Sequence, residues 1–352
     1  MMDPKPIIEN QRGASAVLVA LCLVVLLAVA ALAVDVGYLL ATKNELQNVA
    51  DAAALAATRQ LGAIYEPMTY DEQTAYVCNP ADILPIAQNI AAKNKAAGVN
   101  IIIKDEDIVI GRWDWATKTL SATLDQPDAV KVTARRQSGI NGAVTTFFSK
   151  IIGIDNVGLF ADATAALTGQ STAGPGELEI PVGISQKWFE PNFCNQPIKF
   201  YPTGDINGCA GWHTFDSWPA NAAKLSDILE DMTPADSAFE SPETVAGESE
   251  FVFIGGNLAS VFDEMQALYE AKKDSDGKWE TNVVVYGHDD CSNPTGEITV
   301  VGFATAIITG VNGPSDDPAH TIFATVICDN VSQGRGSGGN FGTKGSIPGL
   351  VE

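Results

Sequence analysis

Hydrophobic residues are distributed very unevenly along this chain, and the densest run lies close to its start. From Ala14 to Val34 the sequence is apolar except for Ser15, and these 21 residues include six Leu and six Val. A helix of that length covers about 30 Å at 1.5 Å per residue, which matches the hydrocarbon core of a bilayer. The pattern therefore predicts a membrane-spanning helix over residues 14–34.

Two other interpretations of this run remain open. A secretory signal could be cut after Ala31-Leu32-Ala33, although the apolar regions of signals are only about 7–15 residues long. A buried core helix is the other alternative, although such helices usually carry a polar stripe. Lys5 and Arg12 precede the run and Asp35 follows it. The positive-inside rule therefore predicts a cytoplasmic tail over residues 1–13 and export of everything after Asp35.

The helical pattern continues beyond the apolar run, and no Pro interrupts it until Pro67. One continuous helix is expected from about Ala14 to Leu61, with Gly37 as its weakest point. Small and apolar residues recur at helical spacing in its second half and predict a helix-packing face, formed by Leu46, Val49, Ala50, Ala53 and Ala57. Such a stripe usually packs against its own domain, and a partner helix is the alternative.

The remaining pattern combines short helices with grouped β-rich runs, which indicates an α+β fold. Helices are expected at about 86–97, 142–152, 222–231 and 258–272. Strands are expected at 101–103, 108–115, 119–124, 130–135, 179–184, 198–201, 281–286, 298–308 and 321–328, and another apolar run covers 157–167. The two longest strands flank an expected hairpin loop at 310–320. The architecture predicted after the membrane helix is an exported mixed helix and antiparallel-sheet region.

Polar and Gly-rich stretches suggest where this region divides. The sequence GQSTAGPG, at 169–176, is a candidate joint. The predicted organisation is a cytoplasmic tail (1–13), a transmembrane helix (14–34), an extracytoplasmic α+β region (35–168), a linker (169–177), a cysteine-containing β-rich domain (178–331) and a Gly-rich flexible tail (332–352).

Charge restricts the classes of partner. The chain has 21 Lys and Arg against 43 Asp and Glu, so its formal net charge is −22. An acidic protein of this kind repels phosphate backbones, which excludes nucleic acid as an expected partner.

The cysteines predict disulfides on the exported side. Cys22 lies in the apolar run, and five of the six Cys follow it. Thiols outside the cytoplasm tend to pair, so two disulfides are expected among four of them, with three possible connectivities: Cys194, Cys209, Cys291 and Cys328. We favour Cys194 with Cys209, because the loop between them is short, and Cys291 with Cys328. Cys78 is left over, either as a free thiol or joined to a partner chain.

No motif of catalysis, metal binding or cofactor binding stands out in the sequence, so no catalytic residue, metal or cofactor is expected. Ser185, His213 and Asp216 could form a triad, but any chain of this length offers such triples by chance. The aromatic cluster from Trp212 to Trp218 could bind a sugar or a partner, although packing against a cysteine-closed loop is the favoured interpretation.

Several stretches of the first half resemble TadE/TadG-like Flp pilus-assembly proteins. At the N-terminus they are Arg12-Gly13, Ala33-Val34-Asp35-Val36-Gly37 and the run from Leu46 to Ala57. Further on, the segments similar to the extracytoplasmic region of TadG-like proteins are Gly111–Asp114, Asp128–Arg136, Phe147-Phe148 and Ala161–Ala166.

This resemblance implies a non-enzymatic, minor pilin-like accessory component of a Tad/Flp pilus system, which supports pilus biogenesis and surface adhesion. It implies a single-pass protein of the inner membrane with its C-terminal region in the periplasm, or an extracellular location if the chain enters a fibre. The implied partners are the lipid bilayer, through the N-terminal helix, and pilus or secretion components. An anchored surface adhesin or ligand-binding module, with a site near Trp212–Trp218, is the alternative function.

The resemblance also implies a prepilin-type cleavage site at Gly13 and Ala14. Prepilins that polymerise usually carry Glu at the fifth position after the cleavage Gly, and Leu18 stands there in this chain. This departure argues against a major pilin and favours an anchored accessory subunit.

Overall fold

The computed structural model describes residues 12–190, 194–200, 208–234, 239–255 and 258–351. The chain forms two compact units. The first comprises Met1–Ala53, Ala87–Ile108 and Val132–Ala163, and the second comprises Ala54–Ile86, Val109–Lys131 and Thr164–Glu352. Each unit combines separate stretches of the sequence, so the division into units does not test the linker expected at 169–177. That linker stays a prediction.

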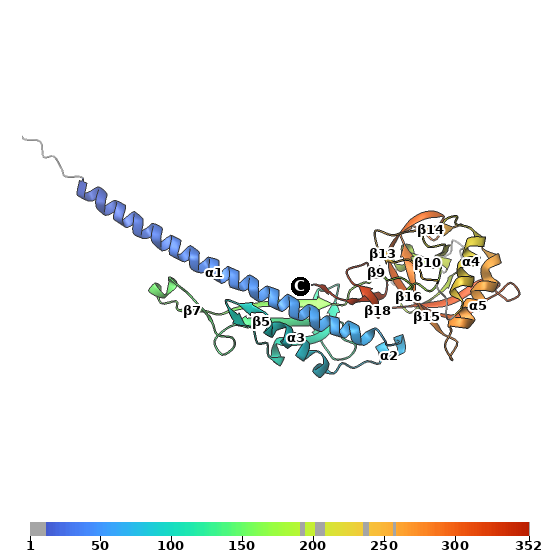
Figure 1. The fold of residues 1–352 in the computed structure, drawn as a ribbon, viewed down its shortest axis with the longest axis horizontal. Coiled ribbons are helices and arrows are strands. Elements are labelled where there is room, and N and C mark those ends of the chain that lie inside the picture. Colours follow the sequence, from blue (N-terminus) through green and yellow to red (C-terminus); the bar gives the residue numbers. More distant parts are fainter. Residues whose placement is uncertain (1–11, 191–193, 201–207, 235–238, 256–257, 352) are drawn as a thin grey trace, which may run out of the picture. The chain divides into compact units, whose positions relative to one another are not determined.

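The predicted N-terminal helix is confirmed as one continuous element, α1 (Arg12–Tyr65), of 54 residues. At 1.5 Å per residue it is about 80 Å long. Its blue ribbon runs unbroken in Figure 1. Gly37 does not interrupt it, since Ala-rich sequence on both sides favours helix strongly enough to tolerate one Gly.

The elements between α1 and residue 166 are two short α-helices, eight strands and three 3-10 helices, the last at Pro80–Asp82, Asp105–Asp107 and Ser149–Ile152. The helices are α2 (Tyr70–Thr74) and α3 (Leu84–Ala92), and the strands are β1 (Lys95–Ala96), β2 (Val99–Asn100), β3 (Ile108–Asp114), β4 (Thr119–Ala122), β5 (Ala129–Arg136), β6 (Val144–Thr145), β7 (Asn156–Val157) and β8 (Leu159–Ala166). Five strands form a sheet in the order β20-β8-β5-β3-β4, in which β20 is Gly349–Leu350. In β5, buried residues alternate with half-buried ones over most of the strand, so one face of the sheet carries the core.

The helix expected at 142–152 is wrong. These residues form β6, which pairs antiparallel with β7, and a 3-10 turn at Ser149–Ile152. The β-branched pair Val144-Thr145 favours an extended backbone. The amides that would begin a helix at 147–149 are instead bonded to a side chain from α1.

The second half of the chain builds a seven-stranded sheet. Its strands, in the order β11-β17-β16-β14-β12-β10-β15, are β10 (Val182–Ser185), β11 (Gln196–Phe200), β12 (Ala210–His213), β14 (Glu250–Ile254), β15 (Trp279–Tyr286), β16 (Gly296–Asn312) and β17 (Thr321–Ile327). A further pairing of β15 with β16 closes five of these strands into a ring. All pairings are antiparallel except β10 with β15. The hairpin predicted around 310–320 is confirmed, because β16 and β17 pair directly.

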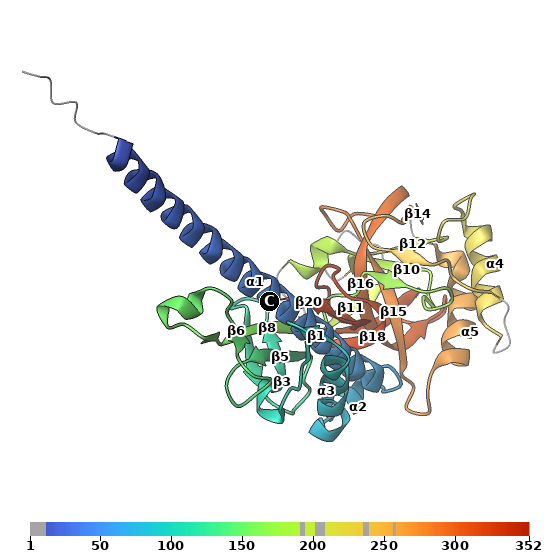
Figure 2. The ribbon, with the colours of Figure 1, turned by 60° about the vertical axis from the view of Figure 1, so that its left-hand side comes forward.

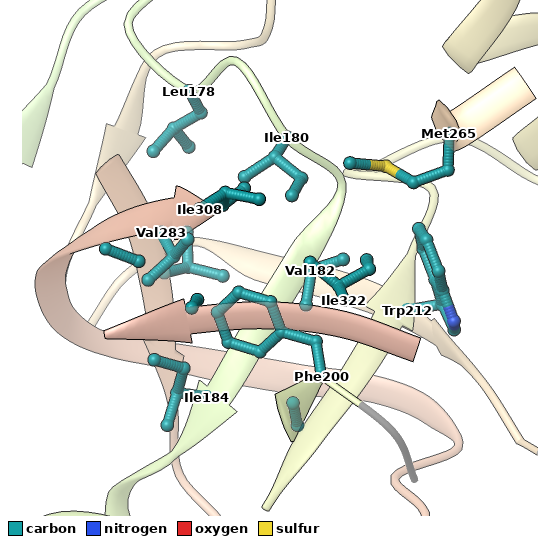
Figure 3. Close-up of a cluster of buried hydrophobic side chains, with 14 of the residues drawn as sticks. Leu178, Ile180, Val182, Ile184, Phe200, Trp212, Met265, Val283, Ile308 and Ile322 are labelled. Carbon is teal, nitrogen blue, oxygen red and sulfur yellow. The ribbon is translucent and has the colours of Figure 1, made fainter. Parts of the chain in front are cut away.

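Helices α4 (Ala222–Met232) and α5 (Phe262–Lys272), both expected from the sequence, lie together beside this sheet, where α5 packs on β16 (Figure 2). The enclosed core is apolar and includes Ile184, Phe200 and Val283, each at most 2% exposed (Figure 3). Two short strands, β9 (Thr172–Ala173) and β13 (Thr244–Val245), pair with each other. Together these elements confirm the α+β class.

The flexible tail predicted at 332–352 is wrong for the residues that the structure describes. They include the end of β18 (Asn330–Arg335), then β19 (Thr343–Ile347) and β20 (Gly349–Leu350). β18 and β19 pair in parallel, and β20 pairs with β8. Lys344 fastens the segment, since its Nζ lies 2.8 Å from an oxygen of Asp128 and 2.7 Å from one of Asp329. Lys344 and Asp128 are both buried, so this ion pair connects the end of the chain to the residue that precedes β5.

Two disulfides form among the four predicted cysteines, but the favoured pairing is wrong. Cys194 is bonded to Cys328, and Cys209 to Cys291. Strand register decides the first pair, since Gln196 of β11 lies opposite Val326 of β17 and brings both cysteines to one end.

Ser185 forms hydrogen bonds on both sides of the second disulfide. Its N–H donates to the carbonyl of Cys209 at 2.9 Å, and its Oγ lies 2.9 Å from the carbonyl of Asp290. Cys78 is free and buried, and burial raises the pKa of its thiol. Loop length is thus a weaker guide to pairing than sheet register.

A non-reducing peptide map should recover Cys194 linked to Cys328, Cys209 linked to Cys291, and Cys78 as a thiol. Replacing both cysteines of either bridge by Ser should lower the free energy of unfolding by about 2–5 kcal/mol, because the unfolded chain regains loop entropy. Cys22→Ala is the control and should leave the exported region unaffected. A map that links Cys194 to Cys209 would contradict the strand register.

Two glycines of α1 should respond in opposite directions to replacement by Ala. A Cβ on Gly62 would lie 2.0 Å from the backbone oxygen of Ser346, whereas a Cβ on Gly37 would meet nothing within 4 Å. Gly62→Ala should therefore destabilise the fold by about 1–3 kcal/mol through overpacking. Gly37→Ala should stabilise the helix by about 0.5–1 kcal/mol. Denaturant unfolding in detergent measures both, and equal effects would contradict the close packing at Gly62.

Candidate functional site

The first half of α1 carries an unshielded apolar surface. The six Leu and six Val between Val17 and Val34 are each more than half exposed. By length and composition this part of the helix is able to cross a membrane, and none of its most apolar stretch is buried by the protein. An exposed apolar surface of this extent needs a non-aqueous environment, because water around it is unfavourable.

Asp35 ends this surface and holds another part of the chain. Its Oδ1 accepts the backbone N–H of Phe147 at 2.8 Å, and its Oδ2 accepts those of Phe148 at 3.0 Å and Ser149 at 2.6 Å. The hydroxyl of Ser149 also donates to Oδ2 at 2.7 Å. One carboxylate thus satisfies four donors of the segment between β6 and β7. We call this arrangement the Asp35 clamp.

The clamp favours the ionised carboxylate. Asp35 is only 2% exposed. That burial opposes its ionisation, but the hydrogen bonds from Ser149, Phe147 and Phe148 together outweigh it and lower the pKa of Asp35 to about 2. The side chain is therefore charged throughout the physiological range, and charged acceptors form the stronger hydrogen bonds.

An aromatic contact lies directly beside the clamp. The rings of Tyr38 and Phe147 meet edge to face, with their centroids 5.2 Å apart. Tyr38 is three residues beyond Asp35, or about 4.5 Å further along the helix. The segment between β6 and β7 is therefore joined to α1 by both polar and apolar contacts at the end of the apolar run.

The predicted helix-packing face lies inside the chain itself. Its five residues, Leu46, Val49, Ala50, Ala53 and Ala57, are each at most 1% exposed. Next to them, Gln47 Nε2 donates to the backbone oxygen of Asp162 at 2.8 Å. This stripe is covered and offers no free surface to a partner helix.

The aromatic cluster near Trp212 is mostly core. Trp212, which Figure 3 shows among the buried side chains, is 2% exposed, and Phe215 is 1% exposed. Only Trp218 is open, at 63%, and its Nε1 lies 3.3 Å from an oxygen of Glu297. The burial of Trp212 and Phe215 agrees with the favoured interpretation that the cluster packs in the core, and a ligand site near Trp218 stays the alternative.

The triad candidates are not brought together. The Nδ1 of His213 accepts the N–H of Phe215 at 3.2 Å, and burial of the whole ring lowers its pKa to about 3, so it is neutral. Ser185 is engaged with the carbonyls of His288 and Asp290. Among the residues that the structure describes, no hydrogen bond joins the three, and no group of three or more His, Cys, Asp or Glu could hold a metal ion.

A cavity of about 300 Å³ lies beside the Cys194–Cys328 bridge. Its charged lining residues are already paired, since Lys344 contacts Asp128 and Asp329, and Arg112 lies 3.2 Å from Asp329. Burial alone would lower the pKa of Lys344, but the charges of Asp128 and Asp329 raise it overall. This network fastens β19 and leaves little charge for a ligand.

The roles of Asp35 and Lys344 are not apparent from the sequence. In the sequence, Asp35 ends an apolar run and belongs to a stretch that resembles TadE/TadG-like proteins, but its hydrogen-bond partners lie more than a hundred residues away. Gly13 and Ala14, the expected cleavage site, lie in the first turn of α1. Cleavage between them stays a prediction.

Asp35→Asn should weaken the clamp, because a neutral amide is a poorer acceptor than a carboxylate. Hydrogen exchange at the amides of Phe147, Phe148 and Ser149 should become faster at neutral pH. In the native protein, the folded-state pKa of about 2 lies below the ordinary 3.8. The contribution of Asp35 to stability is therefore complete above about pH 4 and is lost as the pH falls towards 2.

Asp51→Asn is the matched control on the same helix. Its carboxylate accepts from Gln47 at 2.8 Å and does not contact the clamped amides. This variant should leave exchange at 147–149 unchanged. Equal exchange in the Asp35→Asn variant and the native protein would contradict the clamp.

Comparison with known proteins places the first half of the chain in a family. Residues 13–60 match the "Flp pilus-assembly TadE/G-like" family model, and residues 68–165 match the "Tad-like Flp pilus-assembly" model. No curated protein and no solved structure matches the chain. The matched families are components of pilus assembly and not a known enzyme family. These matched residues, which include α1 with its Asp35 clamp and strands β1–β8, are therefore similar to TadE/G-like Flp pilus-assembly proteins.

Proposed function

We propose that this protein is a membrane-anchored, non-enzymatic accessory component of a Tad/Flp pilus system. Its place would be the inner membrane, crossed once by α1, with the region after Asp35 in the periplasm. In a minor pilin-like role it would support pilus biogenesis and surface adhesion. The observation that carries the proposal is the family match over α1, combined with an apolar half of that helix which the protein leaves uncovered.

The cysteines support an exported C-terminal region. Two disulfides close loops of 134 and 82 residues in sequence. Such bonds persist in oxidising compartments and are rare in the cytoplasm. Asp35 supports an end of the spanning segment at this residue, since an ionised carboxylate is stable outside the hydrocarbon core and costly within it.

The first turns of α1 favour an accessory subunit over the polymerising pilin. Leu18 stands where polymerising prepilins usually carry Glu, and its side chain is 63% exposed on the helix surface. An apolar side chain there fits lipid but cannot neutralise the N-terminal amine of a neighbouring subunit. The large exported region also suits a subunit that contacts the apparatus from the membrane.

The proposed partners are pilus or secretion components. The helix stripe from Leu46 to Ala57 is covered, and so is most of the Trp212 cluster. Contacts with the apparatus would therefore use the outer surface of the exported region. Its formal charge is acidic overall, which favours basic surfaces on those partners.

The test is to remove the anchor while keeping the exported fold. Leu23→Asp combined with Leu26→Asp places two carboxylates near the middle of the apolar run, where each costs about 2.5–3.5 kcal/mol. The variant should leave the membrane fraction, fail to copurify with pilus components and fail to restore pili and surface attachment to a deletion strain. The matched control, Leu23→Ile with Leu26→Ile, keeps the apolar surface and should behave as the native protein.

Two results would contradict the proposal in different ways. Full restoration of pili by the Asp variant would show that anchoring by α1 is unnecessary. A native chain that stays in the membrane but copurifies with no pilus component, and whose deletion leaves pili intact, would refute the assembly role.

A further inference from the structure

A second apolar surface lies on the segment held by the Asp35 clamp. Between β6 and β7, five large apolar side chains point away from the fold: Phe147 at 60% exposed, Phe148 at 44%, Ile151 at 85%, Ile152 at 73% and Ile154 at 46%. Soluble surfaces seldom expose so many large apolar groups within eight residues. We call Phe147–Ile154 the apolar loop.

The clamp fixes the apolar loop at one level of α1. Asp35 follows directly on Val34, the last residue of the apolar run, and it binds the amides of Phe147, Phe148 and Ser149. In Figures 1 and 2 the segment of β6 and β7, drawn in green, is the part of its unit that reaches furthest towards the apolar half of α1. The clamp therefore holds the apolar loop next to the end of the apolar run.

The backbone of the apolar loop is already satisfied near the clamp, which matters for contact with lipid. Asp35 accepts the first three amides, the N–H of Ile154 donates to the oxygen of Ser149 at 3.0 Å, and that of Gly153 donates to the oxygen of Lys150 at 3.0 Å. Unpaired backbone groups oppose transfer out of water, and these bonds lower that cost. The single cation of the apolar loop, Lys150, is exposed and long enough to reach phosphate headgroups.

We propose that the apolar loop inserts its side chains into the interfacial region of the bilayer that α1 crosses, on the exported side. The inference rests on the proposed membrane anchoring of α1. The protein would then have two attachments to one membrane, a spanning helix and an interfacial loop. Together they limit rotation of the first unit about α1 and keep that unit close to the bilayer surface.

Three single-label variants of the full-length protein test this. The native chain is labelled with an environment-sensitive fluorophore at Cys22, the exposed free thiol in the middle of the apolar run. The other two carry Cys22→Ser with either Ile151→Cys or Val99→Cys. A control protein that carries Cys22→Ser and no added cysteine shows how much fluorophore reacts with the buried Cys78. All are reconstituted in phosphatidylethanolamine and phosphatidylglycerol vesicles, with or without bromine on the acyl chains, and are then exposed to aqueous iodide.

Val99 is a suitable control because it is exposed in the same unit but lies further from the membrane. It follows Ala97 in the hairpin of β1 and β2, and the N–H of Ala97 donates to Oε2 of Glu45 at 2.6 Å. Glu45 is ten residues beyond Asp35, or about 15 Å along the helix. A label at Val99 should be quenched by iodide and not by brominated lipid.

The label at Ile151 should be quenched by brominated lipid about half as strongly as the label at Cys22, because interfacial segments penetrate only about 5–10 Å. It should also resist iodide. Adding Asp35→Asn should reduce lipid quenching at Ile151 while leaving it unchanged at Cys22, since the clamp and not the helix is weakened.

Each other outcome overturns the proposal and identifies what failed. Strong lipid quenching at Cys22 with iodide quenching at Ile151 means that the helix spans the bilayer while the apolar loop stays in water. Protection of Ile151 from both quenchers means that protein covers it, either a second copy or another part of the chain. Absence of lipid quenching at Cys22 refutes the anchor itself, and with it the basis of the inference.

Discussion

The apolar half of α1 has no protein around it within the described part of the chain, and its surface therefore requires lipid. The rest of the molecule has to be compatible with this requirement. Twelve Leu and Val side chains on one helix are each more than half exposed, over a length that matches a hydrocarbon core. Nothing within the described part of the chain covers them. Lipid is the environment that stabilises such a surface, and the family match to pilus-assembly proteins agrees with a membrane location. Asp35 and the four bridged cysteines all follow the apolar run in the sequence.

The second half of α1 is bonded to two strands that lie far apart in the sequence, β8 and β19. Thr58 Oγ1 donates to the oxygen of Ala165 in β8, and Arg59 donates to the oxygen of Ser346 in β19. Gly62 lets the helix backbone approach Ser346 closely. β20 pairs with β8 itself, so the last residues described complete a sheet that begins in the family-matched region. The C-terminal strands therefore belong structurally to the Tad-like part of the chain.

Much of this fold follows from local sequence pattern, and the errors have physical reasons. The long helix, the hairpin of β16 and β17 and helix α4 depend on periodicity and propensity, which neighbouring residues determine. The cysteine pairing, the ordered segment after Arg335 and the missing helix at 142–152 depend on contacts across long stretches of chain. Lys344 reaches Asp128 from 216 residues away, and Asp35 reaches Ser149 from 114. No local pattern contains that information, although a charged residue at the end of an apolar run does signal a boundary.

The most direct test of the central claim is protease protection of the native protein in spheroplasts. If α1 spans the membrane with the folded region outside, external protease should cut the chain beyond Asp35 and release that region. The membrane should retain a fragment that contains residues 14–34, identifiable by mass spectrometry. A chain that stays intact until the cells are lysed, or one that is recovered whole in the soluble fraction, would contradict a helix that spans the membrane with its folded region outside.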